Sequence, residues 1–177
     1  MTGSGPLRRE AARRLRDAGV ASPEWDADEL LAHVLGTTRG RLLTVDEQAE
    51  RFAALVSRRA GREPLQHLTG TAAFRHVELA VGPGVFVPRP ETELLAGWAI
   101  EHALGLGDPV VVDLCTGSGA IARAIADEVP SARVFAVELD EPAHDWAARN
   151  LAGTGVDLRL GDMSEAFEDL AGTVDVI

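Results

Sequence analysis

The stretch from Val110 to Ala122 constrains the fold of this chain more than any other part of the sequence. Its first five residues, Val110–Leu114, are an almost unbroken β-branched apolar run, which is typical of a short strand buried on both faces. Gly117 and Gly119 follow, and without a Cβ the backbone there can turn sharply and approach a ligand closely. Ala120–Glu128 then continues as a helix whose first amides point back at the strand end. The stretch therefore predicts a site for a nucleotide-like ligand.

Acidic residues lie where the strands of this region are expected to end. Asp113 lies near the end of the first strand and offers a carboxylate to a cationic group. Glu138 follows the next apolar run, Val134–Val137, at roughly 20 residues beyond the glycines, the spacing at which an acidic side chain reaches ribose hydroxyls. Asp162 follows a third run, and it is either a turn residue or an acceptor for an exocyclic purine amine.

The second part of the chain alternates strand and helix. The expected elements are Val110–Leu114, Ala120–Glu128, Arg133–Val137, Glu141–Ala152 and Val156–Leu160. Strict alternation predicts an α/β fold with a parallel sheet, right-handed crossovers and helices on its faces. Ligands bind beyond the carboxyl ends of such strands. The last apolar run, Thr173–Ile177, is expected to be a fourth strand, which leaves the sheet incomplete at the C-terminus.

The first part of the chain is predicted to be a small helical bundle. Helices are expected over residues 6–18, 22–36 and 44–61, the third starting where Thr44 and Glu47 have capping-box spacing. The bundle is either a packing cap on the main domain or a platform that holds a protein substrate.

Alternating residues after Gly70 predict a β-hairpin, with the turn at Gly82-Pro83-Gly84 and the return strand at Val85-Phe86-Val87. In the next loop, two prolines fix Arg89 between them. Arg89 either pairs with a nearby carboxylate or lines the ligand pocket, and Glu91 in the same loop is a second possible pocket residue.

The length of 177 residues suits one ordinary domain plus a small appendage. We expect a helical domain over residues 1–70, a hairpin linker over 71–90, and the first part of the ligand-binding domain over 91–177. No apolar run approaches the roughly 20 residues that span a bilayer, and the arginine-rich start is not followed by an apolar signal core. A cytoplasmic protein with no membrane contact is expected.

Charge and residue chemistry exclude several classes of function. The formal net charge is -11, and residues 64–177 carry 6 arginines against 18 acidic residues. Such a surface repels phosphate backbones, so we expect no direct binding to nucleic acid. The single cysteine, Cys115, cannot form an intrachain disulfide, and the histidines lack metal-ligand spacing, so no metal is expected. No nucleophile arrangement is recognisable, and spacing alone assigns no catalytic residue.

Several of these stretches together resemble a known fold. Asp113–Ala122, Ala136–Asp140 and Gly161-Asp162 are similar to the S-adenosylmethionine-dependent methyltransferases, a Rossmann-like parallel-sheet fold. Pro64–Gly70 and Val87–Glu93 resemble signatures of one family within it, the protein-(glutamine-N5) methyltransferases that modify peptide chain release factors.

The resemblance implies a role for each matching residue. The loop residues Cys115, Thr116, Gly117, Ser118 and Gly119 would hold the methionine part of S-adenosylmethionine. Glu138 would bind the ribose hydroxyls, and Asp162 with Met163 would surround the adenine. The family commonly has Asp at the position of Glu138, which keeps the carboxylate, and usually has an aromatic residue at the position of Met163.

The resemblance also implies an activity. The family transfers the methyl group of S-adenosylmethionine to the side-chain amide nitrogen of a glutamine in class I release factors, and we expect this protein to act on that partner as a monomer. Family members grip the amide with an Asn-Pro-Pro-Tyr motif a few residues after the strand that begins here at Val174. The catalytic groups are therefore expected beyond Ile177, and the 177-residue chain by itself is expected to be inactive.

Three alternatives stay open. Gly117 and Gly119 with Ala122 and Glu138 also satisfy the dinucleotide-binding fingerprint, which would make the protein an NAD-dependent oxidoreductase, although Asp113 and Asp162 argue against it. The chain could instead be a non-catalytic fragment that binds a cofactor or a partner. A sister enzyme that methylates a ribosomal protein is the third alternative.

Overall fold

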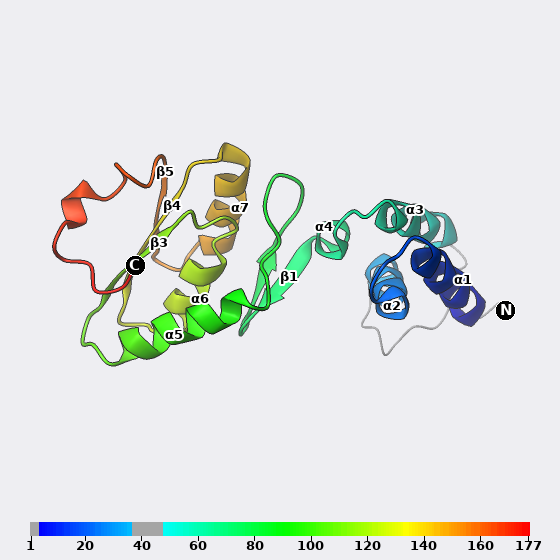
Figure 1. Ribbon diagram of the computed structural model, residues 1–177, viewed down its shortest axis with the longest axis horizontal. Coiled ribbons are helices and arrows are strands. Elements are labelled where there is room, and N and C mark those ends of the chain that lie inside the picture. The colour runs from blue at the N-terminus through cyan, green and yellow to red at the C-terminus, as the bar shows by residue number, and fades with distance from the viewer. Residues whose placement is uncertain (1–3, 37–47) are drawn as a thin grey trace. The chain divides into compact units, whose positions relative to one another are not determined.

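The computed structural model describes residues 4–36 and 48–177, and the chain divides into two compact units that span residues 1–69 and 70–177 (Figure 1). The predicted separation of a hairpin linker from the ligand-binding domain within the second unit stays a prediction. None of the helices in the described residues has the length and apolar character needed to cross a bilayer.

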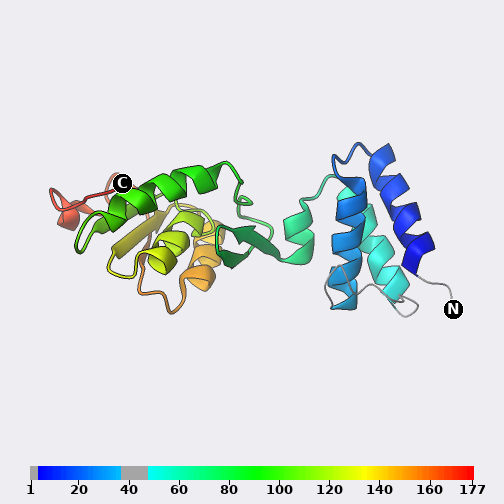
Figure 2. The same cartoon turned by 90° about the horizontal axis from the view of Figure 1, so that it is seen from below.

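The described residues of the first unit form four helices. They are α1 (Ser4–Asp17), α2 (Pro23–Leu35), α3 (Ala49–Ala60) and α4 (Leu65–Thr69). The first three lie side by side (Figures 1 and 2), and their apolar stripes share a core in which Leu15, Leu30 and Leu31 are fully buried. The first two predicted helices are confirmed, the capping box predicted at Thr44 and Glu47 lies outside the described residues, and the short α4 was not predicted.

The second unit begins with an antiparallel hairpin, but its register differs from the prediction. Strand β1 (Thr71–Phe74) pairs with β2 (Val77–Ala80), so the turn lies at Arg75-His76. The predicted return strand at Val85–Val87 is therefore wrong. The chain does turn at Gly82-Pro83-Gly84, where the Val85 amide donates to the Gly82 carbonyl at 3.3 Å, but this turn does not join the two strands of the hairpin.

The turn residue Arg75 bonds to distant parts of the second unit. Arg75 adopts the left-handed conformation at φ 50°, and its guanidinium donates to both carboxylate oxygens of Glu128 at 2.5 and 2.7 Å. Arg75 also donates to the carbonyl of Glu93 at 3.3 Å. These partners lie 18 to 53 residues away in the sequence, so the local alternation of residues could not reveal the turn.

The residues that were predicted to form the hairpin turn instead pack against a helix of the second unit. The helix is α7 (Glu141–Leu151), and its Trp146 donates from the indole nitrogen to the carbonyl of Pro83 at 3.1 Å. A Cβ at Gly82 would lie 2.5 Å from the Trp146 ring. Only glycine therefore lets the indole approach this backbone.

Gly82→Ala is expected to lower the free energy of unfolding by about 1–3 kcal/mol, because the added methyl overlaps a large, hydrogen-bonded ring. Chemical denaturation followed by tryptophan fluorescence measures the loss. Gly107→Ala is the matched control, since a Cβ there meets no atom within 4 Å and the change should stay within about 0.5 kcal/mol. Equal effects of the two substitutions would contradict the packing argument.

The predicted parallel sheet is present. Strands β3 (Val110–Leu114), β4 (Arg133–Glu138) and β5 (Asp157–Leu160) pair in the order β3-β4-β5. The expected fourth strand appears only as a bridge between Val176 and Val111, on the free side of β3. The parallel order means that the segments after β3, β4 and β5 emerge at one edge of the sheet.

The two faces of the sheet are covered differently. On one face, Val111 and Ala136 share a core cluster with α5 (Thr92–Leu104), α6 (Ala120–Glu128) and α7, the three helices that Figure 1 shows beside the strands. The opposite face is covered, among the described residues, by a smaller cluster. Its buried members are Val110, Val112 and Leu170. The last of these lies in the 3-10 helix Glu168–Leu170.

Candidate functional site

The glycine loop, residues 115–119, connects β3 to α6 at the carboxyl edge of the sheet. Cys115, Gly117 and Gly119 all have positive φ angles, of 59°, 60° and 80°. The amide of Thr116 donates to the carbonyl of Val137 at 3.0 Å, which ties the loop to the end of β4. The backbone thus makes the sharp turn that the sequence predicted for this position.

Open space lies over one glycine of the loop and protein over the other. A Cβ at Gly117 would meet no atom within 4 Å, whereas a Cβ at Gly119 would lie 3.1 Å from the Leu151 side chain. Cys115 is exposed. The surface around Gly117 is therefore a cradle that a small ligand can approach to backbone distance, and the predicted contact of this loop with the methionine part of S-adenosylmethionine stays a prediction.

Glu138 reaches the glycine loop from the end of β4. Its Oε2 accepts from the amide of Gly117 at 2.8 Å, and its Oε1 accepts from the amides of Leu139 and Asp140 at 2.9 and 3.0 Å. A carboxylate has about four acceptor positions, so capacity is left for ligand hydroxyls. The predicted contact of Glu138 with ribose stays a prediction.

Asp113 is a buried support of the loop. Its Oδ2 accepts from the Thr116 hydroxyl at 2.6 Å and from the Ala122 amide at 3.1 Å. Its Oδ1 accepts no hydrogen bond among the described residues. In this part of the chain, every fully buried polar side-chain atom has a hydrogen-bond partner, so Oδ1 is not fully buried and can be reached by solvent. Burial raises the pKa of Asp113, and the nearby Glu138 charge adds to this, while the two hydrogen bonds oppose it.

Asp113→Asn is expected to fold, because an amide oxygen can still accept from Thr116 and Ala122. The raised pKa makes the native state bind the Asp113 proton more tightly than the unfolded state, so wild-type stability falls as pH rises through the unfolded pKa of about 3.9 towards the native pKa. The difference in unfolding free energy, variant minus wild type, should therefore increase with pH over this range and then become constant. Urea titrations at a series of pH values measure the difference, and a difference that does not change with pH would contradict the argument.

The third predicted carboxylate is held in a turn. Asp162 is exposed, and its Oδ1 accepts from the amide and the hydroxyl of Ser164 at 2.9 and 2.7 Å, bonds that lower its pKa. These contacts match the turn-residue interpretation, while the purine interpretation stays a prediction. The neighbouring Met163 lies close to the glycine loop, since its sulfur accepts from the Cys115 thiol at 3.6 Å. Met163 also lines a pocket of about 250 Å³ with Leu114 and Phe167.

The two predicted pocket residues outside the sheet are less closely connected. The Arg89 guanidinium lies 5.1 Å from the centre of the Phe86 ring, and both side chains are exposed. Within the described residues, no hydrogen bond or ion pair joins Arg89 or Glu91 to the glycine loop. The start of their segment contacts α7, because a Cβ at Gly84 would lie 2.9 Å from Pro142 in the first turn of that helix.

One residue that the sequence did not point to, Asn150, joins the hairpin to the glycine loop. Asn150 is 6% exposed near the end of α7, and its side chain bonds both to Ala80 in β2 and to Ser118 in the glycine loop. Its partners lie 32 and 70 residues away. No spacing rule connects such positions, and the only hint in the sequence is that Asn150 is the sole asparagine.

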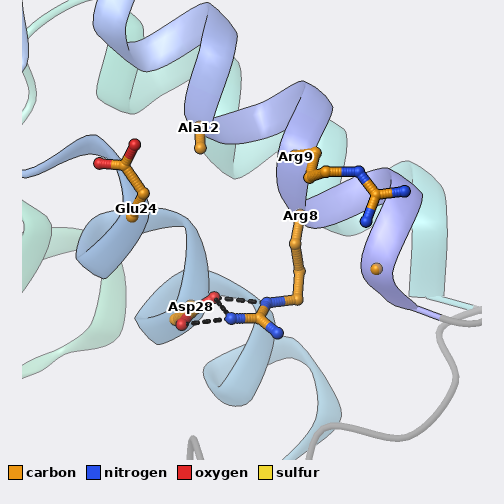
Figure 3. A pocket seen from close by; sticks show the side chains of 6 residues that line it. Arg8, Arg9, Ala12, Glu24 and Asp28 are labelled. Carbon is orange, nitrogen blue, oxygen red and sulfur yellow. Dashed lines mark hydrogen bonds and ion pairs between the residues drawn. The ribbon is translucent and has the colours of Figure 1, made fainter.

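A pocket of about 190 Å³ in the first unit lies outside the predicted site. It is lined by Gly5, Arg8, Arg9, Ala12, Glu24 and Asp28. Figure 3 shows Arg8 directed at Asp28, to which it donates two bonds of 2.5 Å, and Arg9 pointing elsewhere. The pair neutralises its own charges and joins α1 to α2, so it stabilises the bundle rather than selecting a ligand.

Two family models match the chain. Residues 6–70 match the PrmC N-terminal domain, and residues 111–177 match a methyltransferase domain. The first match covers most of the first compact unit, and the second match lies within the second compact unit.

Curated relatives extend over nearly the whole chain. A release factor glutamine methyltransferase of Streptomyces coelicolor is 56% identical, over 95% of this chain and 61% of the relative. A second release factor glutamine methyltransferase, from Mycolicibacterium smegmatis, is 50% identical over 94% of this chain and 61% of the relative. A 4-amino-L-phenylalanine/4-methylamino-L-phenylalanine methyltransferase of Streptomyces pristinaespiralis is 41% identical, over 95% and 61%. The chain thus spans about three fifths of the length of these relatives.

Proposed function

Since this chain is a homologue of the release factor glutamine methyltransferases, we propose that it forms the cofactor-binding part of an enzyme that methylates the side-chain amide of a release-factor glutamine. The observation that carries the proposal is the carboxyl edge of the sheet, where Glu138 bonds to the Gly117 amide beneath open space. We also propose that the protein acts as a monomer in the cytoplasm on a class I release factor.

Each part of the site has a proposed task. The backbone of the glycine loop holds the methionine part of S-adenosylmethionine, the Glu138 carboxylate accepts from the ribose hydroxyls, and Asp162 with Met163 lies against the adenine. Two short distances support this assignment. The loop after β3 is joined to the end of β4 by the bond from the Gly117 amide to Glu138 at 2.8 Å, and to the segment after β5 by the contact of Cys115 with Met163 at 3.6 Å. When bound there, S-adenosylmethionine would supply the methyl group: the bond from its sulfur to the methyl would break as the bond to the amide nitrogen forms, which leaves a thioether and releases one proton from the amide nitrogen.

Alignment of the two reactants is the main task of such an enzyme. An amide nitrogen is a poor nucleophile because its lone pair is delocalised into the carbonyl, so the nitrogen must be held in line with the methyl group. Such positioning contributes roughly 7–11 kcal/mol. We propose that residues 115–119 and 138 fix the donor, while the groups that grip the glutamine lie in the remaining part of the relatives' length.

One specific observation favours a second candidate function. The relative that carries the name of an aminophenylalanine methyltransferase aligns with the same 95% share of this chain as the first relative, although at 41% rather than 56% identity. Methylation of an aromatic amine on a small amino acid therefore remains a candidate, and the higher identity favours the release factor.

A comparison of the two candidate substrates tests the proposal. The chain is joined to the C-terminal part of the Streptomyces coelicolor relative that it does not cover, and it is incubated with S-adenosylmethionine and either a glutamine-containing release-factor peptide or 4-amino-L-phenylalanine. We expect a one-methyl mass shift on the peptide glutamine. Methylation of the amino acid alone would establish the second candidate, and methylation of neither would count against both.

A further inference from the structure

We infer that Asn150 is a positioning residue, which holds the glycine loop (residues 115–119) in a fixed place relative to the segment after β2 (residues 81–91). The inference deepens the proposed function and rests on it for its catalytic meaning. It concerns two segments that come from distant parts of the sequence and that both bond to the Asn150 side chain or directly follow a residue that does.

The side chain of Asn150 makes three hydrogen bonds in opposite directions. Its Oδ1 accepts from the Ala80 amide at 2.8 Å, and its Nδ2 donates to the Ala80 carbonyl at 2.9 Å. The second hydrogen of Nδ2 goes to the carbonyl of Ser118 at 2.8 Å. The primary amide thus pairs with Ala80 as a neighbouring strand would, and the same nitrogen anchors the middle of the glycine loop.

No other side chain of similar size can make this set of bonds. Both Nδ2 hydrogens are used and both go to carbonyls, so a carboxylate at this position would face two acceptors with no donor. An aliphatic side chain would leave buried Ser118 and half-buried Ala80 without these partners. The next residue, Leu151, packs where a Cβ of Gly119 would lie, so the end of α7 supports the loop through two adjacent residues.

The bonds matter for the proposed reaction because they link the glycine loop to Ala80, which leads directly into residues 81–91. Residues 81–91 pass along the start of α7 and carry Arg89 and Glu91, the predicted pocket residues, while the loop is the proposed holder of the methyl donor. A displacement of about 1 Å between reacting groups can cost roughly 100-fold in rate. Asn150 therefore acts on transfer through Ser118 and Ala80, without touching either reactant.

Asn150→Asp tests the inference, with Arg123→Leu as the matched control. Arg123 donates to the backbone carbonyl of Asn150 at 2.8 Å, so its loss weakens the same end of α7 without removing a bond to Ser118 or Ala80. In hydrogen exchange of the 177-residue chain without ligand, we expect Asn150→Asp to speed exchange about 10-fold or more in residues 115–122 and 78–91 together, while β3 and β4 stay protected. Arg123→Leu should leave both segments within about twofold of wild type.

A second readout links the effect to the cofactor. Affinity for S-adenosylhomocysteine should fall about 10-fold or more in Asn150→Asp and less than about twofold in Arg123→Leu, at a temperature where both remain folded. If Asn150→Asp does not fold, Asn150→Ser replaces it, since a hydroxyl keeps one donor and one acceptor. Wild-type exchange in both segments, or the same exchange pattern in Arg123→Leu, would overturn the inference. Failure of the wild-type chain to bind the ligand would count against the proposed function alone, because the exchange experiment still decides the role of Asn150.

Discussion

Replacement of Glu138 by alanine is expected to weaken binding of S-adenosylmethionine about 10- to 150-fold. The carboxylate is proposed to accept hydrogen bonds from two ribose hydroxyls, and hydrogen bonds to a charged acceptor contribute on the order of 1.5–3 kcal/mol. The structure adds a second reason, because the same carboxylate holds the Gly117 amide at 2.8 Å, and alanine would release the loop that carries the donor. Isothermal titration calorimetry on wild type and variant gives the ratio of affinities.

Asp140→Ala is the control for Glu138→Ala. Asp140 lies two residues further on and caps α7 by accepting from the Ala143 amide at 3.3 Å, so its loss should lower stability by about 1 kcal/mol. Its removal takes away a neighbouring carboxylate that has no proposed contact with the ligand, and the affinity should stay within about threefold of wild type. An unchanged affinity in Glu138→Ala would mean that the ribose lies elsewhere.

Gly117→Val is expected to reduce cofactor binding by more than about 100-fold while the protein remains folded. A Cβ at Gly117 would enter open space rather than protein, so the valine branches would fill the volume proposed for the ligand. The cost to stability comes from the backbone at φ 60°, about 1–2 kcal/mol for a residue with a Cβ. Calorimetric titration and thermal denaturation of the same sample measure the two effects.

Gly119→Ala separates ligand obstruction from structural damage. Its backbone has φ 80°, and a Cβ there would lie 3.1 Å from Leu151. The main expected effect is therefore a loss of stability of about 1–3 kcal/mol, from overpacking and backbone conformation together. If Gly117→Val bound the cofactor as well as wild type did, the cradle over the glycine loop would not be the binding site.

The parts of the fold that depend on local patterns were predictable from the sequence. The run of β-branched residues at Val110–Leu114 and the glycines after it predicted β3, the loop and the start of α6 at Ala120, because burial on both faces and positive φ angles leave a direct trace in residue type. The hairpin register was not predictable, because the residue at the turn, Arg75, bonds to the distant Glu128 and no local pattern marks that contact. The same limit applied to Gly82, whose role is fixed by Trp146.

The candidate site was predictable only in part, for a related reason. Glu138 and the glycine loop could be paired because the distance between them follows from one strand-helix-strand unit. The support given by Asn150 was hidden, since a single asparagine on a helix has no periodicity to mark it and both of its partners are backbone groups. The second role of Asp113, holding Thr116 and Ala122, was hidden in the same way.

Titration of the 177-residue chain with S-adenosylmethionine, S-adenosylhomocysteine and NAD tests the central claim most directly. The two adenosyl ligands are expected to bind at least about 10-fold more tightly than NAD, since the open loop at Gly117 is proposed to hold the methionine part, whereas a second nucleotide has no predicted contacts. Calorimetry at ligand concentrations up to about 1 mM covers the relevant range. Binding of NAD more tightly than either adenosyl ligand, or no binding of the adenosyl ligands, would contradict the assignment of this site.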